Sequence, residues 1–273
     1  SVQVKALSTD DVVALSTYQV SNLTTATMAA LSTAQVQAIE TADIQALTTR
    51  QLGSISTTTV QALSTDQVVA LTTYQVANLS TGNLKALTSD QVKAIETGDI
   101  QALTTGQIGS LGTSTVAALS TDQVVALQTN QINALSTGNV QALSTDQVVA
   151  LTTGQVAGIS TRNIAALSTD SVSVLTTDQI GAVSTAGLAA LSTGQVKALS
   201  TDNVVALNTY QVSNLTTATM AALTTAQVQA IETADIQALT TRQLGSISTA
   251  TVQALSTDQV VALTTYQVAN LST

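Results

Sequence analysis

The sequence predicts a mainly helical solenoid of octapeptide repeats, with one short capped helical turn per repeat, that forms an elongated rod. Three observations predict it: an eight-residue unit recurs without a slip, two aliphatic positions recur inside it, and a helix-capping pattern lies between them. From Ala6 onward the chain divides into 33 complete octads, for example ALSTDQVV and ALTTYQVA. Units this short bury their apolar side chains only against neighbouring units, as in a solenoid.

The composition opposes several other classes of protein. The chain has 273 residues, of which 44% are hydrophobic and 8% are charged, whereas disordered segments combine low hydrophobicity with high charge. A net charge of −9 opposes binding to nucleic acid, which depends on basic patches. We expect no membrane span, because no stretch of about 18 consecutive apolar residues occurs. Cys and His are both absent, so disulfides are excluded.

Each octad position has its own residue preference. Position 1 is small, position 2 is Leu, Ile or Val, and position 3 is mostly Ser or Thr. Position 4 is Thr in every complete octad except at Ser89, position 6 is mostly Gln, Asp or Asn, and position 7 is Val, Ile, Leu or Met. Positions 5 and 8 vary freely, which is typical of an exposed surface.

One continuous helix does not fit this period, because eight residues advance the helix by about 80° beyond two full turns. An apolar stripe would then wind around the rod instead of forming one face. On a strand, positions 2 and 7 point to opposite faces, although a turn inside the octad would repair this and leave a β-solenoid as the alternative. Because Ala, Leu and Gln favour helices over strands, one short helix per octad is the preferred interpretation.

The helix is expected to begin at the Ser/Thr pair of each octad. With Ser64 as N-cap, Gln67 completes a capping box, and Leu63 and Val68 form a hydrophobic staple. In the alternative register Thr65 is the N-cap. The same two choices apply to the octad that contains Ser144, Thr145 and Gln147.

Such helices are too short to be stable alone, because isolated helices below about 12 residues are marginal. The aliphatic residues at positions 2 and 7 must therefore pack on neighbouring octads and form a thin continuous core. The predicted core includes Leu63, Val68, Leu71, Val76, Leu143 and Val148. The number of octads in one coil stays open.

A longer period of 56 residues overlies the octads, so that similar octads begin at Ala6, Ala62 and Ala118. Residues 14–81 and 206–273 differ at only three places, which indicates a duplication. Solenoids need polar terminal caps, but neither end of the chain departs from the repeat. We therefore expect residues 1–273 to be one continuous solenoid taken from a longer array.

The sequence offers little for catalysis or metal binding. Glu40 and Asp43, in AIETADIQ, could form a carboxylate pair. The same pair recurs in two further octads, as Glu96 with Asp99 and Glu232 with Asp235. Carboxylates also favour the positively polarised N-terminus of a helix, and this interpretation is preferred. We expect no enzyme, no catalytic or metal-binding residue and no cofactor.

The four tyrosines are candidate surface contacts. All of them occupy variable position 5: Tyr18, Tyr74, Tyr210 and Tyr266. Aromatic residues can anchor a partner, but here 56 residues or more separate them, so scattered surface residues are the favoured interpretation. An Asn-Leu-Ser/Thr sequon follows each one, at Asn22, Asn78, Asn214 and Asn270, and could accept an N-glycan. A regular Thr lattice at position 4 gives ice binding as a minor alternative.

The octad AL-[ST]-T-x-Q-[VI]-x, which fills the whole chain, resembles the repeat arrays of very large bacterial proteins that are secreted or displayed on the cell surface and described as adhesin-like. The resemblance implies an extracellular or cell-surface location and a structural role as a rod, stalk or filament. An adhesive or ruler-like binding module is the alternative. Haem binding, a label some such proteins carry, finds no ligand here, because Met28 and Met220 occupy apolar position 7. The expected partners are copies of this chain, end to end or side by side, or neighbouring repeats of a longer chain.

Overall fold

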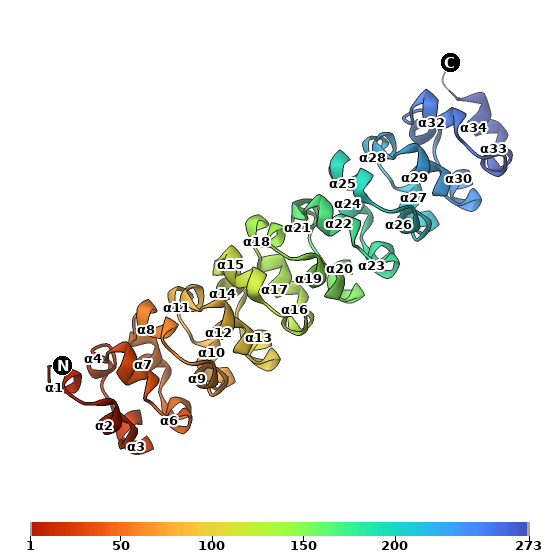
Figure 1. Cartoon of the computed structure of the whole chain (residues 1–273). Coiled ribbons are helices and arrows are strands. Elements are labelled where there is room, and N and C mark those ends of the chain that lie inside the picture. The colour runs from red at the N-terminus through yellow and green to blue at the C-terminus, as the bar shows by residue number, and fades with distance from the viewer. Residues whose placement is uncertain (1, 272–273) are drawn as a thin grey trace. The chain divides into compact units, whose positions relative to one another are not determined.

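The computed structural model describes residues 2–271 and contains two compact units, Ser1–Ala142 and Leu143–Thr273. Within the described residues there are 34 α-helices of four to six residues and no strand. The chain is therefore a helical solenoid, as predicted, and the β-solenoid alternative has no support (Figure 1).

The described part of the first unit consists of α1 (Val2–Lys5), α2 (Thr9–Val13), α3 (Thr17–Ser21), α4 (Thr25–Met28), α5 (Thr33–Gln37), α6 (Thr41–Ala46), α7 (Thr49–Ser54), α8 (Thr57–Gln61), α9 (Thr65–Val69), α10 (Thr73–Ala77), α11 (Thr81–Ala86), α12 (Ser89–Ala94), α13 (Thr97–Ala102), α14 (Thr105–Ser110), α15 (Thr113–Ala118), α16 (Thr121–Ala126), α17 (Thr129–Ala134) and α18 (Thr137–Gln141).

The described part of the second unit consists of α19 (Thr145–Ala150), α20 (Thr153–Ala157), α21 (Thr161–Ala166), α22 (Thr169–Ser173), α23 (Thr177–Ala182), α24 (Thr185–Ala189), α25 (Thr193–Ala198), α26 (Thr201–Val205), α27 (Thr209–Ser213), α28 (Thr217–Ala222), α29 (Thr225–Ala230), α30 (Thr233–Ala238), α31 (Thr241–Leu244), α32 (Thr249–Gln253), α33 (Thr257–Ala262) and α34 (Thr265–Ala269).

The N-cap of each helix from α2 to α34 is the residue at octad position 3. At α9, Ser64 has extended backbone angles, and its Oγ accepts a hydrogen bond from Gln67 N at 3.1 Å. Gln67 Oε1 in turn accepts a hydrogen bond from Ser64 N at 3.0 Å, and the two bonds together form a capping box. Thr65, at octad position 4, is the first helical residue. The alternative register, with the position-4 Thr as the N-cap, therefore does not occur. The octad of Ser144 and Gln147 has the same geometry.

At two octads, one in each unit, the Thr at position 4 contributes a methyl group to the stack. A Cβ placed on Gly138, at octad position 5 in α18, would lie 3.8 Å from Thr113 Cγ2 on α15. In the second unit, a Cβ on Gly194 of α25 would lie 3.6 Å from Thr169 Cγ2 on α22. These two Thr side chains therefore lie within van der Waals reach of the helix three octads later.

Aliphatic side chains from positions 2 and 7 fill the interior of each unit. At position 7, Val68 and Val76 are each 1% exposed, and at position 2, Leu63 and Leu71 are 6% and 5% exposed. In the second unit, Leu143 and Val148 are also buried. Each buried aliphatic side chain of this size contributes roughly 1.5–3 kcal/mol relative to leaving it in water, which is the main stabilising term for helices this short.

Within each unit, most helices pack against the third helix along the chain. In the first unit α6 contacts α9 and α9 contacts α12, and in the second unit α22 contacts α25 and α25 contacts α28. The packing is close enough to select glycine at one position, because a Cβ on Gly109 of α14 would lie 2.9 Å from the carbonyl oxygen of Ala134 at the end of α17. The backbones of these stacked helices therefore approach each other directly.

Candidate interaction surfaces

The glutamine at octad position 6 joins two levels of the solenoid. Gln75 Nε2 donates to Ile44 O at 2.8 Å, to Leu47 O at 2.7 Å and to Gln45 O at 3.3 Å, while its Oε1 accepts from Thr72 N at 2.8 Å. The side chain is only 3% exposed. One amide thus caps its own helix, α10, and also binds the end of α6, four helices earlier in the chain.

The same pair of long-range bonds, to the carbonyls 31 and 28 residues earlier, recurs through both units. The glutamines that make it, besides Gln75, are Gln35, Gln51, Gln67, Gln91, Gln107, Gln123 and Gln131 in the first unit, and Gln179, Gln195, Gln211, Gln227, Gln243, Gln259 and Gln267 in the second. We call this set the amide ladder.

The amide ladder was not predicted from the sequence, which assigned Gln67 and Gln147 to helix caps alone. A signal for it was nevertheless present. Glutamate completes a capping box as well as glutamine does, yet Glu never occurs at position 6. Of these two side chains, only the amide can accept a bond for the cap and also donate others across the coil. Each such hydrogen bond contributes about 1 kcal/mol net to stability.

The reach of the ladder defines the size of one coil. Packing joins helices that are three octads apart, while the amides bind carbonyls 28 and 31 residues earlier. One coil therefore takes between three and four octads. Along one edge of the first unit in Figure 1, α8, α11, α15 and α18 follow one another in alternating steps of three and four. Two coils thus take seven octads, which accounts for the 56-residue period of the sequence.

Shorter side chains weaken the ladder at several octads. Asn139 Nδ2 reaches only Leu111 O, at 3.0 Å, and Asn203 Nδ2 reaches only Leu175 O, at 2.9 Å. Asp43, Asp99 and Asp235 are also buried at this position, where their carboxylates make no hydrogen bond to the carbonyls of the earlier level. An ionised carboxylate has no proton to donate, so these three octads lack the ladder bonds.

The Glu40 and Asp43 pair lies at the start of α6. Glu40 is the exposed N-cap and makes no side-chain cap bond, while Asp43 is buried at the third helical position. Both carboxylates lie where the N-terminus of a helix favours negative charge. Within residues 2–271 no three acidic side chains lie close enough together to hold a metal ion.

The tyrosines and the sequons share one local arrangement. Tyr18 and Tyr74 are 78% and 71% exposed in the first unit, and Tyr210 and Tyr266 are 71% and 72% exposed in the second. The sequon Asn ends the same helix, because Asn78 Nδ2 donates to Tyr74 O at 2.7 Å. An N-glycan at Asn78 would have to compete with this C-cap bond. Glycosylation stays a prediction.

Hydrogen bonding lowers the pKa of one exposed carboxyl group near the N-terminus. Ser8 N and Ser8 Oγ both donate to Asp11 Oδ2, at 2.9 Å and 2.8 Å, and these bonds hold the pKa of Asp11 below its ordinary value. Asp11 occupies the same position 6 as the ladder glutamines. Here the carboxylate serves only the local cap of α2.

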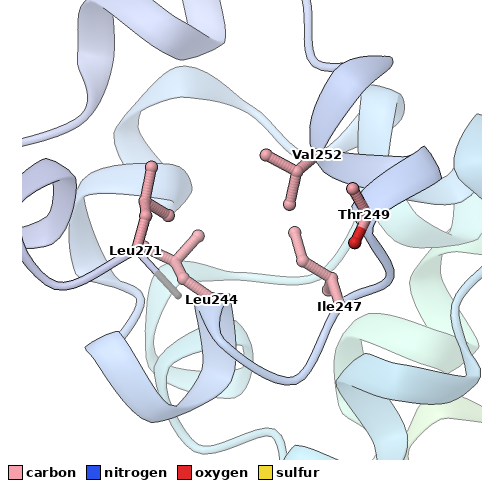
Figure 2. Close-up of a pocket in the computed structure, with 5 residues that line it drawn as sticks. All are labelled: Leu244, Ile247, Thr249, Val252 and Leu271. Atoms are coloured by element: carbon pink, nitrogen blue, oxygen red, sulfur yellow. The ribbon is translucent and has the colours of Figure 1, made fainter. Parts of the chain in front are cut away.

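The two methionines are core residues, and the described part of the chain has two small hollows. Met28 and Met220 are 1% and 0% exposed, so both are core residues. A small cavity of about 70 Å³ lies among Leu244, Ile247, Thr249, Val252 and Leu271 (Figure 2). A shallow groove of about 430 Å³ is lined by Thr41, Gln45, Asp66, Val69, Ala70 and Glu96. In the described part of the chain, no helix is long and apolar enough to cross a membrane.

Comparison with known families agrees with this architecture. The ALTTAQ repeat matches nine times, over residues 4–38, 36–73, 92–129, 124–161, 153–185, 183–217, 204–241, 228–265 and 241–273. These matches cover most of the chain. The protein is therefore a repeat protein with a helical solenoid fold, and it belongs to the ALTTAQ repeat family. No curated protein matches it.

Proposed function

We propose that this chain is a structural segment, a rod or stalk of a larger protein, whose function is to provide length. The observation that carries the proposal is the amide ladder. Octads that carry Gln at position 6 are bonded to the solenoid in the same way, through an amide to the level before them, and helices within each unit pack against helices three octads away. A structure of this kind can be lengthened in equal steps without a new type of contact.

The repeat solenoid fold supports a non-catalytic role. Ser at position 3 serves as a helix cap, as Ser64 does at α9, and the sequence has no His or Cys to activate a hydroxyl. The resemblance to arrays in large secreted or surface-displayed bacterial proteins supports an extracellular location. Labelling of intact cells with an antibody against the array tests the location, and a signal seen only after lysis would contradict it.

Deletion of whole octads tests the role in providing length. Removal of residues 62–117, seven octads, joins Gln61 to Ala118 in register and leaves the relation of each amide to its carbonyls intact. We expect a folded protein with unchanged helicity per residue and a shorter maximum dimension in small-angle X-ray scattering.

The matched control removes half an octad more. Removal of residues 62–121 breaks the octad register, so the chain should lose ladder bonds at the junction and unfold at a lower temperature. If the in-register deletion unfolds like the control, or if its maximum dimension is unchanged, the proposal fails.

The second candidate is a binding module, adhesive or ruler-like, with specificity at positions 5 and 8. It is favoured by the exposure of Tyr74 and of Val69, which is 45% exposed, in adjacent helices. The Thr at position 4 is exposed in most octads, so ice binding by a regular array of Thr side chains is a more specific version of this second candidate. Replacement of all four tyrosines by Ser should abolish binding to cells or to a partner if they anchor one, and thermal hysteresis measurements test ice binding directly.

A further inference from the structure

Three aspartates at octad position 6 are buried without a bonding partner. Asp43, Asp99 and Asp235 are 3%, 4% and 3% exposed. Within residues 2–271, their side chains make no hydrogen bond and no ion pair. A buried ionised carboxylate without a partner is costly, because the protein interior does not replace its hydration. These carboxylates therefore need a positively charged partner that the chain itself does not supply.

The amide ladder shows which groups surround this position. Gln75 Nε2 lies 2.8 Å from Ile44 O, 2.7 Å from Leu47 O and 3.3 Å from Gln45 O. Three carbonyl oxygens at the end of the helix four octads earlier thus converge on one point. In a glutamine octad an amide donor occupies that point.

An aspartate at position 6 brings a carboxylate to the same carbonyls. Asn203, whose side chain has the length of an aspartate, approaches the ladder carbonyl of Leu175 to 2.9 Å. For Asp99, the carbonyls 31, 30 and 28 residues earlier are those of Val68, Val69 and Leu71, at the end of α9. A helix end of this kind also carries partial negative charge. Oxygen atoms therefore meet oxygen atoms, and they repel one another unless a cation lies between them.

A glutamate accompanies each buried aspartate. All three glutamates of the chain occupy position 3 of the same three octads: Glu40, Glu96 and Glu232. None of them makes a side-chain cap bond, so each replaces a capping Ser or Thr at a cost to its own helix. Glu96 lines the shallow groove together with Asp66 and Val69. The groove therefore brings solvent and a second carboxylate to the carbonyl end of α9, next to the level of Asp99.

We propose that Asp43, Asp99 and Asp235 each bind a calcium ion. The ion is held between the carboxylate and the backbone carbonyls of the earlier level, with the glutamate of the same octad as a further ligand. Calcium prefers carboxylate and carbonyl oxygens and accepts irregular arrangements of them, whereas magnesium demands a near-ideal octahedron. Only two ligands of each ion are acidic side chains, and the others are carbonyls and water. The ion joins two levels as the amide does elsewhere, which goes beyond the structural role proposed above.

Calorimetric titration with CaCl₂ tests the proposal, on chelator-treated chain in physiological NaCl. We expect one ion for each buried aspartate, with dissociation constants on the order of 10⁻⁴ M, as in extracellular calcium modules. The temperature of unfolding, followed by circular dichroism, should rise with calcium concentration because the folded chain alone binds the ion. MgCl₂ at the same concentration should have a smaller effect.

Replacement of the aspartates by Asn removes the ligand and keeps the chain folded, since Asn203 already occupies this position. The combined change is Asp43→Asn, Asp99→Asn and Asp235→Asn. It should abolish calcium binding and the calcium-dependent rise in unfolding temperature. In chelator this variant should unfold at a higher temperature than the unchanged chain, because Asn donates to a carbonyl that the carboxylate repels.

The matched control removes the same charge from exposed position 5. It combines Asp122→Asn, Asp146→Asn and Asp178→Asn, in octads with Gln at position 6. This variant should bind calcium like the unchanged chain. A third variant, with Gln at all three glutamates, should bind calcium more weakly and stay folded, because Gln128 already serves at position 3.

The outcomes are distinct. A chain that shows no heat of calcium binding and no rise in unfolding temperature overturns the proposal. Equal calcium responses from the buried-site Asn variant and its control also overturn it, because the response would then be screening of the net charge of −9. Equal effects of CaCl₂ and MgCl₂ on the unchanged chain count against it in the same way. None of these results affects the octad-deletion test, so the structural role and the calcium sites stand or fail separately.

Discussion

At the scale of the residue, the amide at octad position 6 combines a local and a long-range bond. In the local bond, Gln75 Oε1 accepts from the backbone N–H of Thr72, the N-cap of its own helix. A Glu side chain could accept this bond as well. The long-range bonds from Gln75 Nε2 require a donor in a site that is 3% exposed. The requirement for a donor explains why the position excludes Glu.

Gln75→Glu therefore tests the ladder with the cap retained. The variant should lose about 3 kcal/mol of stability, because it removes two short bonds and buries a carboxylate beside the Ile44 and Leu47 carbonyls. Urea unfolding followed by circular dichroism measures the change. Gln19→Glu is the matched control: Gln19 is exposed and its side chain hydrogen-bonds only to Ser16 among the described residues, so the change should shift stability by less than about 0.5 kcal/mol. Equal losses from both variants would contradict the ladder.

Asp99→Gln should stabilise the first unit. A glutamine here would take the position that it holds in most octads and could bind the carbonyls of Val68 and Leu71. Its side chain could also accept from the backbone N–H of Glu96, a capping bond that α13 lacks. We expect a gain of about 1–2 kcal/mol, measured by the urea midpoint. Asp66→Gln, the same change at an exposed site, should be neutral or slightly destabilising because it removes a charge near a helix N-terminus. A loss of stability in Asp99→Gln would show that the buried carboxylate has its own role.

At the scale of the element, helices of four to six residues form because most of them are capped at the N-terminus and packed against other helices. A single turn has few internal hydrogen bonds to offset the ordering of its backbone. The capping box provides two bonds at the N-terminus. At the C-terminus of α6, the ladder amide binds Leu47 O and also Ile44 O, which accepts from Leu47 N as well. Both ends of one short helix are thus satisfied by glutamines, its own and one from a helix four octads later.

Ser64→Ala tests the cap and its register. It removes the acceptor of Gln67 N at 3.1 Å and should cost about 1 kcal/mol. Thr65→Ala is the control: Thr65 is the exposed first helical residue, so its replacement should cost less than Ser64→Ala. Chemical denaturation of the two variants measures the difference. A larger loss of stability in Thr65→Ala than in Ser64→Ala would contradict the assignment of Ser64 as the N-cap.

At the scale of the whole molecule, the strongest helix contacts within each unit join helices three positions apart, so stability is approximately a sum of many similar local terms. A lesion in the core should then unfold a segment and not the entire chain. Cooperativity over many octads depends on the strength of the contacts between levels. The amide ladder and the aliphatic core provide those contacts together.

Leu71→Asp tests this locality. Leu71 is 5% exposed, so a carboxylate there should open the levels around α9 and α10 while leaving the second unit protected. Hydrogen exchange read by mass spectrometry should show faster exchange in neighbouring helices of the first unit only. Val69→Asp, at a site 45% exposed, should change exchange very little. Loss of protection throughout the chain would indicate one global cooperative unit.

The sequence by itself determined the helical solenoid and the octad family, because capping and apolar spacing act within a few residues of one another. Ser64 and Gln67 are only three residues apart, so their relation could be recognised in the one-dimensional pattern. The tertiary structure alone decided how many octads close a coil, and with it which carbonyl each amide reaches. The directions in which successive helices are joined, summed over three to four octads, bring Gln75 to Ile44 and Leu47. No local pattern encodes such a sum, so the second function of the glutamine became visible only in three dimensions.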